Sequence, residues 1–472
     1  MNATTTAGTV SPAEGKGLKT RHLTMMGLGS AIGAGLFLGT GVGISAAGPA
    51  ILIAYVIAGA LVVLVMQMLG EMAAARPSSG SFATYARQAF GHWGGFYLGW
   101  LYWFMLIGVM GSEMTGAAAI MGAWFDVEPW IPALIAVVFF AVVNFAAVRG
   151  FGEFEYWFAI IKVAVICVFL VIGVALIFGW LPGHSFVGTE NFLGDGFMPN
   201  GLPGLAAGLL AVAFAFGGIE IVTIAAAEST EPGNSIKRAV RAVIWRIGVF
   251  YVGSVLVISF LLPYEQIGDA DTAAESPFTM VLGLADIPGA VVIMEAVIVA
   301  ALLSAFNAQI YASSRVCYNL AVDRDAPGVF RRTNDAGVPI PAVVLSMVFA
   351  FGSVALQWWN PTGLLDFLLS AVGGCLVVVW VMIVLSYLKL HPELERNGEI
   401  AQVRMWGYPW LAWTTLIALA ALILLMLFDA DARFQLVSVA GVSVVLLVAS
   451  AITHYAQRNS PAPVSPSRRG RQ

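Results

Sequence analysis

The sequence predicts an all-α polytopic membrane protein, and three features lead to this fold class: an apolar composition, long apolar runs and a one-sided distribution of basic residues. Of the 472 residues, 59% are hydrophobic and 11% are charged, whereas soluble domains average about 25% charged residues. The mean hydropathy is +0.87. One soluble core cannot bury this much apolar surface, so we expect lipid to surround part of the molecule.

The apolar runs have the length of membrane-spanning helices. A helix that crosses a bilayer needs about twenty largely apolar residues. Twelve runs meet this requirement, which predicts twelve spans. We expect them at residues 24–46, 49–74, 93–123, 130–148, 155–179, 203–227, 240–262, 287–320, 340–358, 363–388, 407–428 and 434–456.

The basic residues predict the orientation of these spans. All Lys and Arg residues except Arg433 and Lys162 lie in, or at the ends of, the segments on the N-terminal side of the membrane. Basic segments stay in the cytoplasm, so we expect both termini there and the chain in the inner (plasma) membrane. Residues 1–20 are predicted to form a disordered cytoplasmic N-terminus, and 459–472 a basic cytoplasmic tail.

Two spans contain glycine clusters at membrane depth. Span 1 reads GLGSAIGAGLF at 27–37, and span 6 reads AFAFGGIE at 213–220. The two spans are five apart, so the second runs through the membrane in the opposite direction. This spacing predicts an inverted repeat of 21–179 (spans 1–5) and 203–388 (spans 6–10), followed by two further spans at 407–456.

The glycine clusters predict discontinuous helices that bind a ligand. Glycine tolerates unwound backbone, and unwinding frees N–H and C=O groups that hydrocarbon cannot satisfy but a polar ligand can. A half-helix N-terminus favours a carboxylate, while freed carbonyls favour an ammonium group. The alternative is close helix packing through small residues. The five-span spacing favours a pair of broken helices that hold both ends of an amino acid.

Ionisable residues within spans mark functional sites by default. Burial disfavours the charged form of an amine, so Lys162 in span 5 is predicted to load and release the coupling proton; alternatively, it is a permanent cation paired with a carboxylate. Glu113 shares a face of span 3 with Met110, and we expect it to contact a substrate amine unless it is neutral and buried. Glu220 directly follows the span 6 glycines. We expect it to be a gate or pocket residue or, alternatively, to hydrogen-bond to a neighbouring helix.

Other residues and motifs narrow the class of function. Phe214 and Phe216 flank the span 6 glycines, where they either cover a substrate as a thin gate or simply pack. The chain lacks a GxxxxGK[ST] phosphate loop and the HExxH and CxxC motifs. We therefore expect no enzymatic activity, cofactor, metal or nucleic-acid partner, and energy for uphill transport must come from an ion gradient. The sequence leaves the oligomeric state open.

Several motifs together resemble those of bacterial amino acid permeases of the amino acid–polyamine–organocation superfamily. The resemblance extends from about Gly17 to span 12. The motifs are GLKTRHLTMMGLGSAIGAGLFLGTG, AAGPAILIAYVIAGALV, GEMAAARPSSGSFATYA, GEFEYWFAIIKV, LGDGFMPNG and AFAFGGIEIVTIAAAESTEP.

The resemblance implies a LeuT-type fold of 5+5 inverted repeats with discontinuous spans 1 and 6, two extra C-terminal spans, and amino acid:proton symport into the cell. It also places a proton-linked lysine in span 5, where Lys162 matches. The backbone positions that it implies for substrate binding are Ser30, Ala31, Ile32, Gly33, Ala34 and Gly35 in span 1, and Phe214, Ala215, Phe216, Gly217 and Gly218 in span 6.

The substrate stays open between several classes. EIVTIAAAES and RMWGYPWLAW look most like γ-aminobutyrate permeases, whereas MGSEMTGAA in span 3 is more similar to aromatic amino acid and proline permeases. We expect γ-aminobutyrate or a neutral or aromatic amino acid. The alternative functions are an amino acid exchanger, a sodium-coupled symporter and, outside transport, a membrane amino acid sensor.

Overall fold

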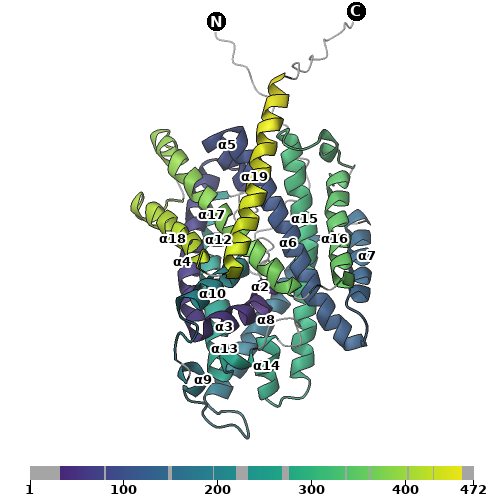
Figure 1. Ribbon diagram of the computed structural model, residues 1–472, viewed down its shortest axis with the longest axis vertical. Helices are drawn as coiled ribbons and strands as arrows, with labels where there is room; N and C mark the ends of the chain where they lie inside the picture. Colours follow the sequence, from purple (N-terminus) through teal and green to yellow (C-terminus); the bar gives the residue numbers. More distant parts are fainter. Residues whose placement is uncertain are drawn as a thin grey trace, which may run out of the picture.

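The protein is all-helical throughout the part of the chain that the computed structural model describes (Figure 1). That part comprises residues 32–78, 81–146, 151–194, 196–218, 232–267, 276–334, 337–359, 361, 363–400, 403–428 and 430–459. The principal helices are α2 (Ala34–Phe37), α3 (Gly39–Ala47), α4 (Ile51–Ala75), α5 (Ser81–Phe90), α6 (His92–Phe125), α7 (Trp130–Ala146), α8 (Phe151–Ile177), α9 (Glu190–Leu193), α10 (Gly201–Ala215), α12 (Pro232–Arg246), α13 (Gly253–Leu261), α14 (Pro277–Leu284), α15 (Ala290–Val322), α16 (Ile340–Trp359), α17 (Leu364–Arg396), α18 (Trp410–Met426) and α19 (Ala430–Asn459).

Each of the twelve predicted runs overlaps at least one of these helices. Within the described residues, eight helical stretches are long and apolar enough to cross a membrane; the first, Ala34–Ala75, comprises α2, α3 and α4. Three shorter apolar helices lie at 130–145, 201–215 and 410–426. The last turn of α10 ends at Ala215, at the predicted break, which is why this helix is short. These lengths support a polytopic membrane protein, while the count of twelve spans stays a prediction.

The first two runs pack back on each other through a sharp turn. Gly48 has a φ of 59°, a left-handed conformation that glycine adopts without steric cost. Pro49 follows at the start of a short 3₁₀ turn, Gly48–Ala50, which leads directly into α4. The turn separates α3 from α4 although the apolar sequence is nearly continuous there.

The helices α2 and α3 lie against α10 in the antiparallel sense. A Cβ atom added to Gly35 would lie 2.6 Å from the Ala215 Cα atom, and one added to Gly43 would lie 3.6 Å from the Ala211 Cβ atom. Further along, a Cβ atom on Gly208 would lie 2.8 Å from the Ala47 Cβ atom. Residue numbers therefore rise along α2 and α3 as they fall along the contacting residues of α10. This is the relative direction that an inverted repeat requires of its first helices.

Ion pairs join several predicted cytoplasmic segments at one end of the molecule. Arg76, after α4, pairs with Glu393 on α17 and with Glu399, each at 2.7 Å. Hydrogen bonds from Arg76 hold the pKa of Glu399 well below its usual range, at about 2. At the same end, Arg87 on α5 pairs with Asp325, which follows α15. These contacts bring together segments that the charge distribution assigned to one side of the membrane.

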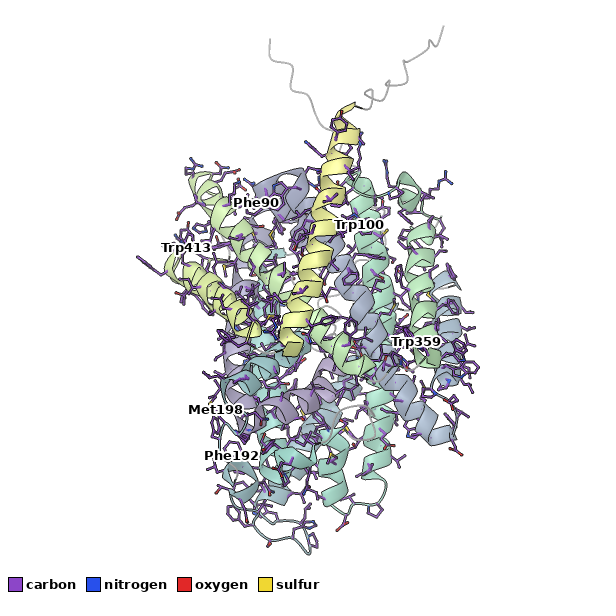
Figure 2. All side chains as sticks on the ribbon, in the orientation of Figure 1. Phe90, Trp100, Phe192, Met198, Trp359 and Trp413 are labelled. Carbon is purple, nitrogen blue, oxygen red and sulfur yellow. The ribbon has the colours of Figure 1, made fainter. Side chains whose placement is uncertain are left out.

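The outer surface of the bundle is apolar. The long helices α6 and α15 run side by side through the molecule, and α7 and α16 pack together at one edge (Figure 1). Figure 2 shows large aromatic side chains on the periphery, including Trp413 of α18 and Trp359 of α16. These two side chains are 51% and 74% exposed, respectively. Such exposure is unfavourable in water and expected in contact with lipid.

Candidate functional site

The two predicted helix breaks meet in the interior. Among the described residues of span 1, α2 begins at Ala34 directly after the non-helical Gly33. In span 6, α10 ends at Ala215 and the chain turns through 216–218, with Gly218 at a φ of 86°. Gly35 and Ala215 touch backbone to backbone, since even a Cβ atom at Gly35 would overlap Ala215. The structure therefore brings both breaks to one place.

Glu113 of α6 lies directly on the span 1 break. Its carboxylate is 4% exposed, and its Oε2 atom accepts a hydrogen bond of 3.0 Å from the Ala34 backbone N–H. A Cβ atom at Gly33 would overlap the Glu113 Oε1 atom. Glycine at position 33 thus leaves the space that the carboxylate fills.

Lys162 of α8 lies in the same interior region. Its side chain is buried, and its Nζ atom donates a hydrogen bond of 3.2 Å to the Ser304 hydroxyl on α15. Lys162 is also within electrostatic range of the Glu113 carboxylate. The two ionisable residues of spans 3 and 5 therefore lie in the same interior region, and Glu113 is the one that contacts the span 1 break.

Aromatic rings surround the end of α10. The Phe216 ring centroid lies 5.1 Å from that of Tyr251 and 5.9 Å from that of Tyr55. The Tyr251 hydroxyl donates a hydrogen bond of 2.9 Å to the Ala215 carbonyl, one of those freed where α10 ends. Tyr55 is hydrogen-bonded to the Thr40 hydroxyl at 3.0 Å. The break is thus contacted by side chains from two other helical segments, α4 and the segment that holds Tyr251.

Sequence reasoning missed both tyrosines. Tyr251 lies in a π-helical turn, Ile247–Val252, between α12 and α13, and such turns are frequent at functional sites. A π-turn leaves no clear trace in an apolar sequence. The available signal was the phenolic hydroxyl itself, a polar group within a predicted span that needs a partner.

A second aromatic cluster covers the other end of α2. The Phe278 ring lies 5.1 Å from that of Phe37 and 4.6 Å from that of Phe169. The Ser276 hydroxyl donates a hydrogen bond of 2.7 Å to the Phe37 carbonyl. These contacts connect α14 and α8 to the C-terminal end of α2. They were not predicted from the sequence.

The remaining predicted residues have different placements. Met110 is buried in a separate apolar cluster with Phe140 and Phe306, so the structure does not place it among the contacts of Glu113 described above. Phe214 is buried, and its ring would lie 3.3 Å from a Cβ atom at Gly35. Ser30, Ala31 and Glu220 lie outside the described residues. Ile32, Gly33, Ala34, Gly35, Phe214, Ala215, Phe216, Gly217 and Gly218 border the two breaks.

The chain is similar to known proteins over nearly its whole length. Residues 22–459 match the amino acid permease family model. An aromatic amino acid transport protein, AroP, from Corynebacterium glutamicum is 72% identical over 93% of this chain and 95% of its own length. A probable GABA permease from Pseudomonas aeruginosa is 42% identical (90% and 89% covered), and an AroP from Escherichia coli K12 is 34% identical (87% and 90% covered). The family predicted from the sequence motifs is confirmed: this chain belongs to the amino acid permeases of the amino acid–polyamine–organocation superfamily.

Proposed function

We propose that this protein is a secondary transporter that imports aromatic amino acids together with protons. The observation that carries the proposal is the meeting of the two helix breaks, with Glu113 hydrogen-bonded to the Ala34 amide. A site between two broken helices near the midplane suits alternating access, in which one part of the bundle rocks against the other. Proteins of this family transport amino acids. The breaks offer polar backbone groups for both the carboxylate and the ammonium group of an amino acid.

The substrate backbone is proposed to bind to the unwound segments. The Ala34 N–H already donates to Glu113, so the other N–H groups of the span 1 break are proposed to bind the substrate carboxylate. Carbonyls at the end of α10 suit an ammonium group. Glu113 adds a carboxylate beside the site that attracts the substrate amine. The proposed binding set is Ser30, Ala31, Ile32, Gly33, Ala34, Gly35, Met110, Glu113, Phe214, Ala215, Phe216, Gly217 and Gly218.

Lys162 is proposed as the proton-coupling group, with Glu220 as a gating residue. Lys162 is buried beside Ser304 and within electrostatic range of Glu113. A proton that arrives at this pair changes the charge next to the span 1 break, which links protonation to the shape of the binding site. A sodium-coupled symporter and a proton-independent exchanger are the alternatives within transport.

Aromatic amino acids are the favoured substrates for two reasons. The relative with 72% identity is named for aromatic amino acid transport, and Phe216, Tyr55 and Tyr251 provide aromatic rings next to the breaks. Rings in offset or edge-to-face contact stabilise each other beyond simple burial. γ-Aminobutyrate is the second candidate, because relatives at 42% and 40% identity are named for it.

The proposed topology has twelve spans, with 5+5 inverted repeats at 21–179 and 203–388, two further spans at 407–456, and both termini in the cytoplasm. The antiparallel packing of α2 and α3 on α10 supports the inverted repeat. The gathering of Arg76 and Arg87 at one end of the molecule supports the predicted sidedness.

Competition uptake in proteoliposomes tests the substrate class. Uptake of labelled phenylalanine is measured with an excess of tryptophan, tyrosine, γ-aminobutyrate, proline or leucine. We expect tryptophan and tyrosine to compete at least tenfold better than γ-aminobutyrate. Competition by γ-aminobutyrate alone would move the assignment to the second candidate. Specific binding of an amino acid without flux would instead identify a sensor.

A further inference from the structure

A cavity of about 260 Å³ lies beside the end of α4 where the basic segments gather, apart from the helix breaks. Its walls come from α4, from α12 and from the segment 403–406 that precedes α18. Arg241 of α12 and Arg404 line it together with Gln67 and Trp406. The helices α4 and α12 are in close contact there, since a Cβ atom at Gly70 would lie 3.0 Å from the Ile236 Cγ2 atom.

The segment 403–406 is held firmly in place. The Gln67 side-chain amide donates a hydrogen bond of 2.8 Å to the Arg404 carbonyl. The Met405 backbone N–H donates to the fully buried Glu71 carboxylate at 2.5 Å, and that carboxylate also contacts His391 at 2.6 Å. The cavity therefore has preformed walls, and a ligand need not order the segment when it binds.

The cavity presents positive charge that other residues leave available. Within the described residues, the exposed Arg241 has no carboxylate within ion-pair distance. Arg404 pairs with Glu395 at 2.8 Å, but the two side chains are 69% and 52% exposed. Exposed pairs of this kind contribute at most about 1 kcal/mol, so an anion can replace Glu395. Two guanidinium groups from different segments thus face one small cavity.

An apolar, exposed face of α12 and of the π-helical turn that follows it continues from the cavity. Ile244 and Trp245 follow Arg241 on α12 and Val249 lies in the π-helical turn; they are 41%, 68% and 39% exposed, respectively. Trp406, at the cavity, is 54% exposed. Arginine and tryptophan together are typical of the boundary between lipid and water. A matching ligand carries a negative headgroup above an apolar chain, whereas free phosphate matches only the arginines.

We propose that this cavity binds the phosphate headgroup of an anionic phospholipid, with its acyl chains along the exposed face of α12. Basic pockets between membrane helices recognise such headgroups, and each arginine near the surface contributes about a fivefold gain in affinity. The lipid would contact α12 on one side and the segment 403–406 on the other.

Native mass spectrometry of the full-length protein tests the proposal, with phosphatidylglycerol titrated against phosphatidylcholine. We expect R241Q to weaken phosphatidylglycerol binding about fivefold and R241Q/R404Q about 25-fold. R241K retains the charge and is expected to bind nearly as the parent does. R332Q is the matched control, because Arg332 is an exposed arginine that follows the 3₁₀ turn Gly328–Arg331 and does not line the cavity.

Three results would overturn the proposal. One is unchanged phosphatidylglycerol affinity in R241Q/R404Q, and another is equal affinity for phosphatidylcholine in the parent protein. The third is displacement of bound phosphatidylglycerol by millimolar inorganic phosphate, which would identify a site for a free anion. Binding is measured without transport, so these outcomes are independent of the proposed transport function.

Discussion

The Glu113 carboxylate on α6 accepts the backbone N–H of Ala34, the first residue of α2, at 3.0 Å and across 79 sequence positions. This contact joins an intramembrane charge to the span 1 break. Because Gly33 lacks a side chain, the carboxylate can approach the backbone there. Protonation of Glu113, or binding of a ligand to it, therefore directly affects the hydrogen bond at the start of α2.

Glu113→Gln tests the charge at this contact. Glutamine keeps an oxygen that can accept the Ala34 N–H but loses the negative charge that attracts a substrate amine. Hydrogen bonds to charged groups contribute about 1.5–3 kcal/mol, so we expect the KM for uptake to rise about 10- to 100-fold. Glu295→Gln is the control, since that carboxylate is partly exposed and bonds Trp124. An unchanged KM in Glu113→Gln would exclude a role in substrate binding.

Gly33→Ala tests the space that the carboxylate occupies. The added methyl group would overlap the Glu113 Oε1 atom, and inserting a methyl group into a packed interior costs about 1–3 kcal/mol. We expect uptake to fall at least about fivefold at normal membrane abundance. Gly352→Ala on α16 is the matched control, because nothing lies within 4 Å of its added Cβ atom. Equal uptake by the two variants would show that the close fit at Gly33 is not required.

Lys162→Ala separates proton coupling from binding. The variant loses the buried amine that bonds Ser304, so we expect uptake driven by a pH gradient to disappear while exchange of labelled for unlabelled substrate continues. Lys389→Ala removes an exposed lysine from α17 as the control. Uptake in Lys162→Ala that still follows the pH gradient would rule out the coupling role.

Tyr251→Phe removes one hydrogen bond and keeps the aromatic ring. The hydroxyl bonds the Ala215 carbonyl at the end of α10, and such a bond contributes about 0.5–1.5 kcal/mol. We expect a two- to tenfold loss of uptake in initial-rate measurements. Tyr97→Phe, which loses a bond to Ser443 far along the chain in α19, should behave as the parent does. A parent-like rate for Tyr251→Phe would mean that the α10 break needs no such cap.

The Arg76–Glu399 pair gives a prediction for pH. Hydrogen bonds from Arg76 lower the pKa of Glu399 to about 2 from its usual 4.5. The lowered pKa means that the pair stabilises the folded protein above pH 4.5 and loses this contribution as the pH falls toward 2. Carboxyl-resolved NMR should give a midpoint near 2, returning toward 4.5 in Arg76→Gln. A midpoint near 4.5 in the parent protein would contradict the pairing.

Much of the fold was predictable because lipid imposes simple rules on length and charge. Apolar runs of about twenty residues located a helix in every predicted interval. The paired glycine clusters located the end of α10 at Ala215 and the non-helical Gly33 before α2. The apolar runs and the glycine clusters are both local in the sequence, so they can be read without knowing how the helices pack.

The contacts around the site were less predictable because they join distant helices. Glu113 was recognised as an ionisable residue within a span, but its hydrogen bond to the Ala34 backbone depends on how α6 packs against α2. Tyr251 was missed because a π-helical turn rotates it toward Ala215. The roles of Ser30, Ala31 and Glu220 stay predictions, since these residues lie outside the described part of the chain.

Proton-driven phenylalanine uptake by the purified protein in proteoliposomes tests the central claim most directly. With an inward proton gradient and no sodium, labelled phenylalanine should accumulate above its external concentration, and a protonophore should abolish the accumulation. Phenylalanine that only equilibrates across the membrane, or accumulates equally with the protonophore present, would contradict proton-coupled import of aromatic amino acids.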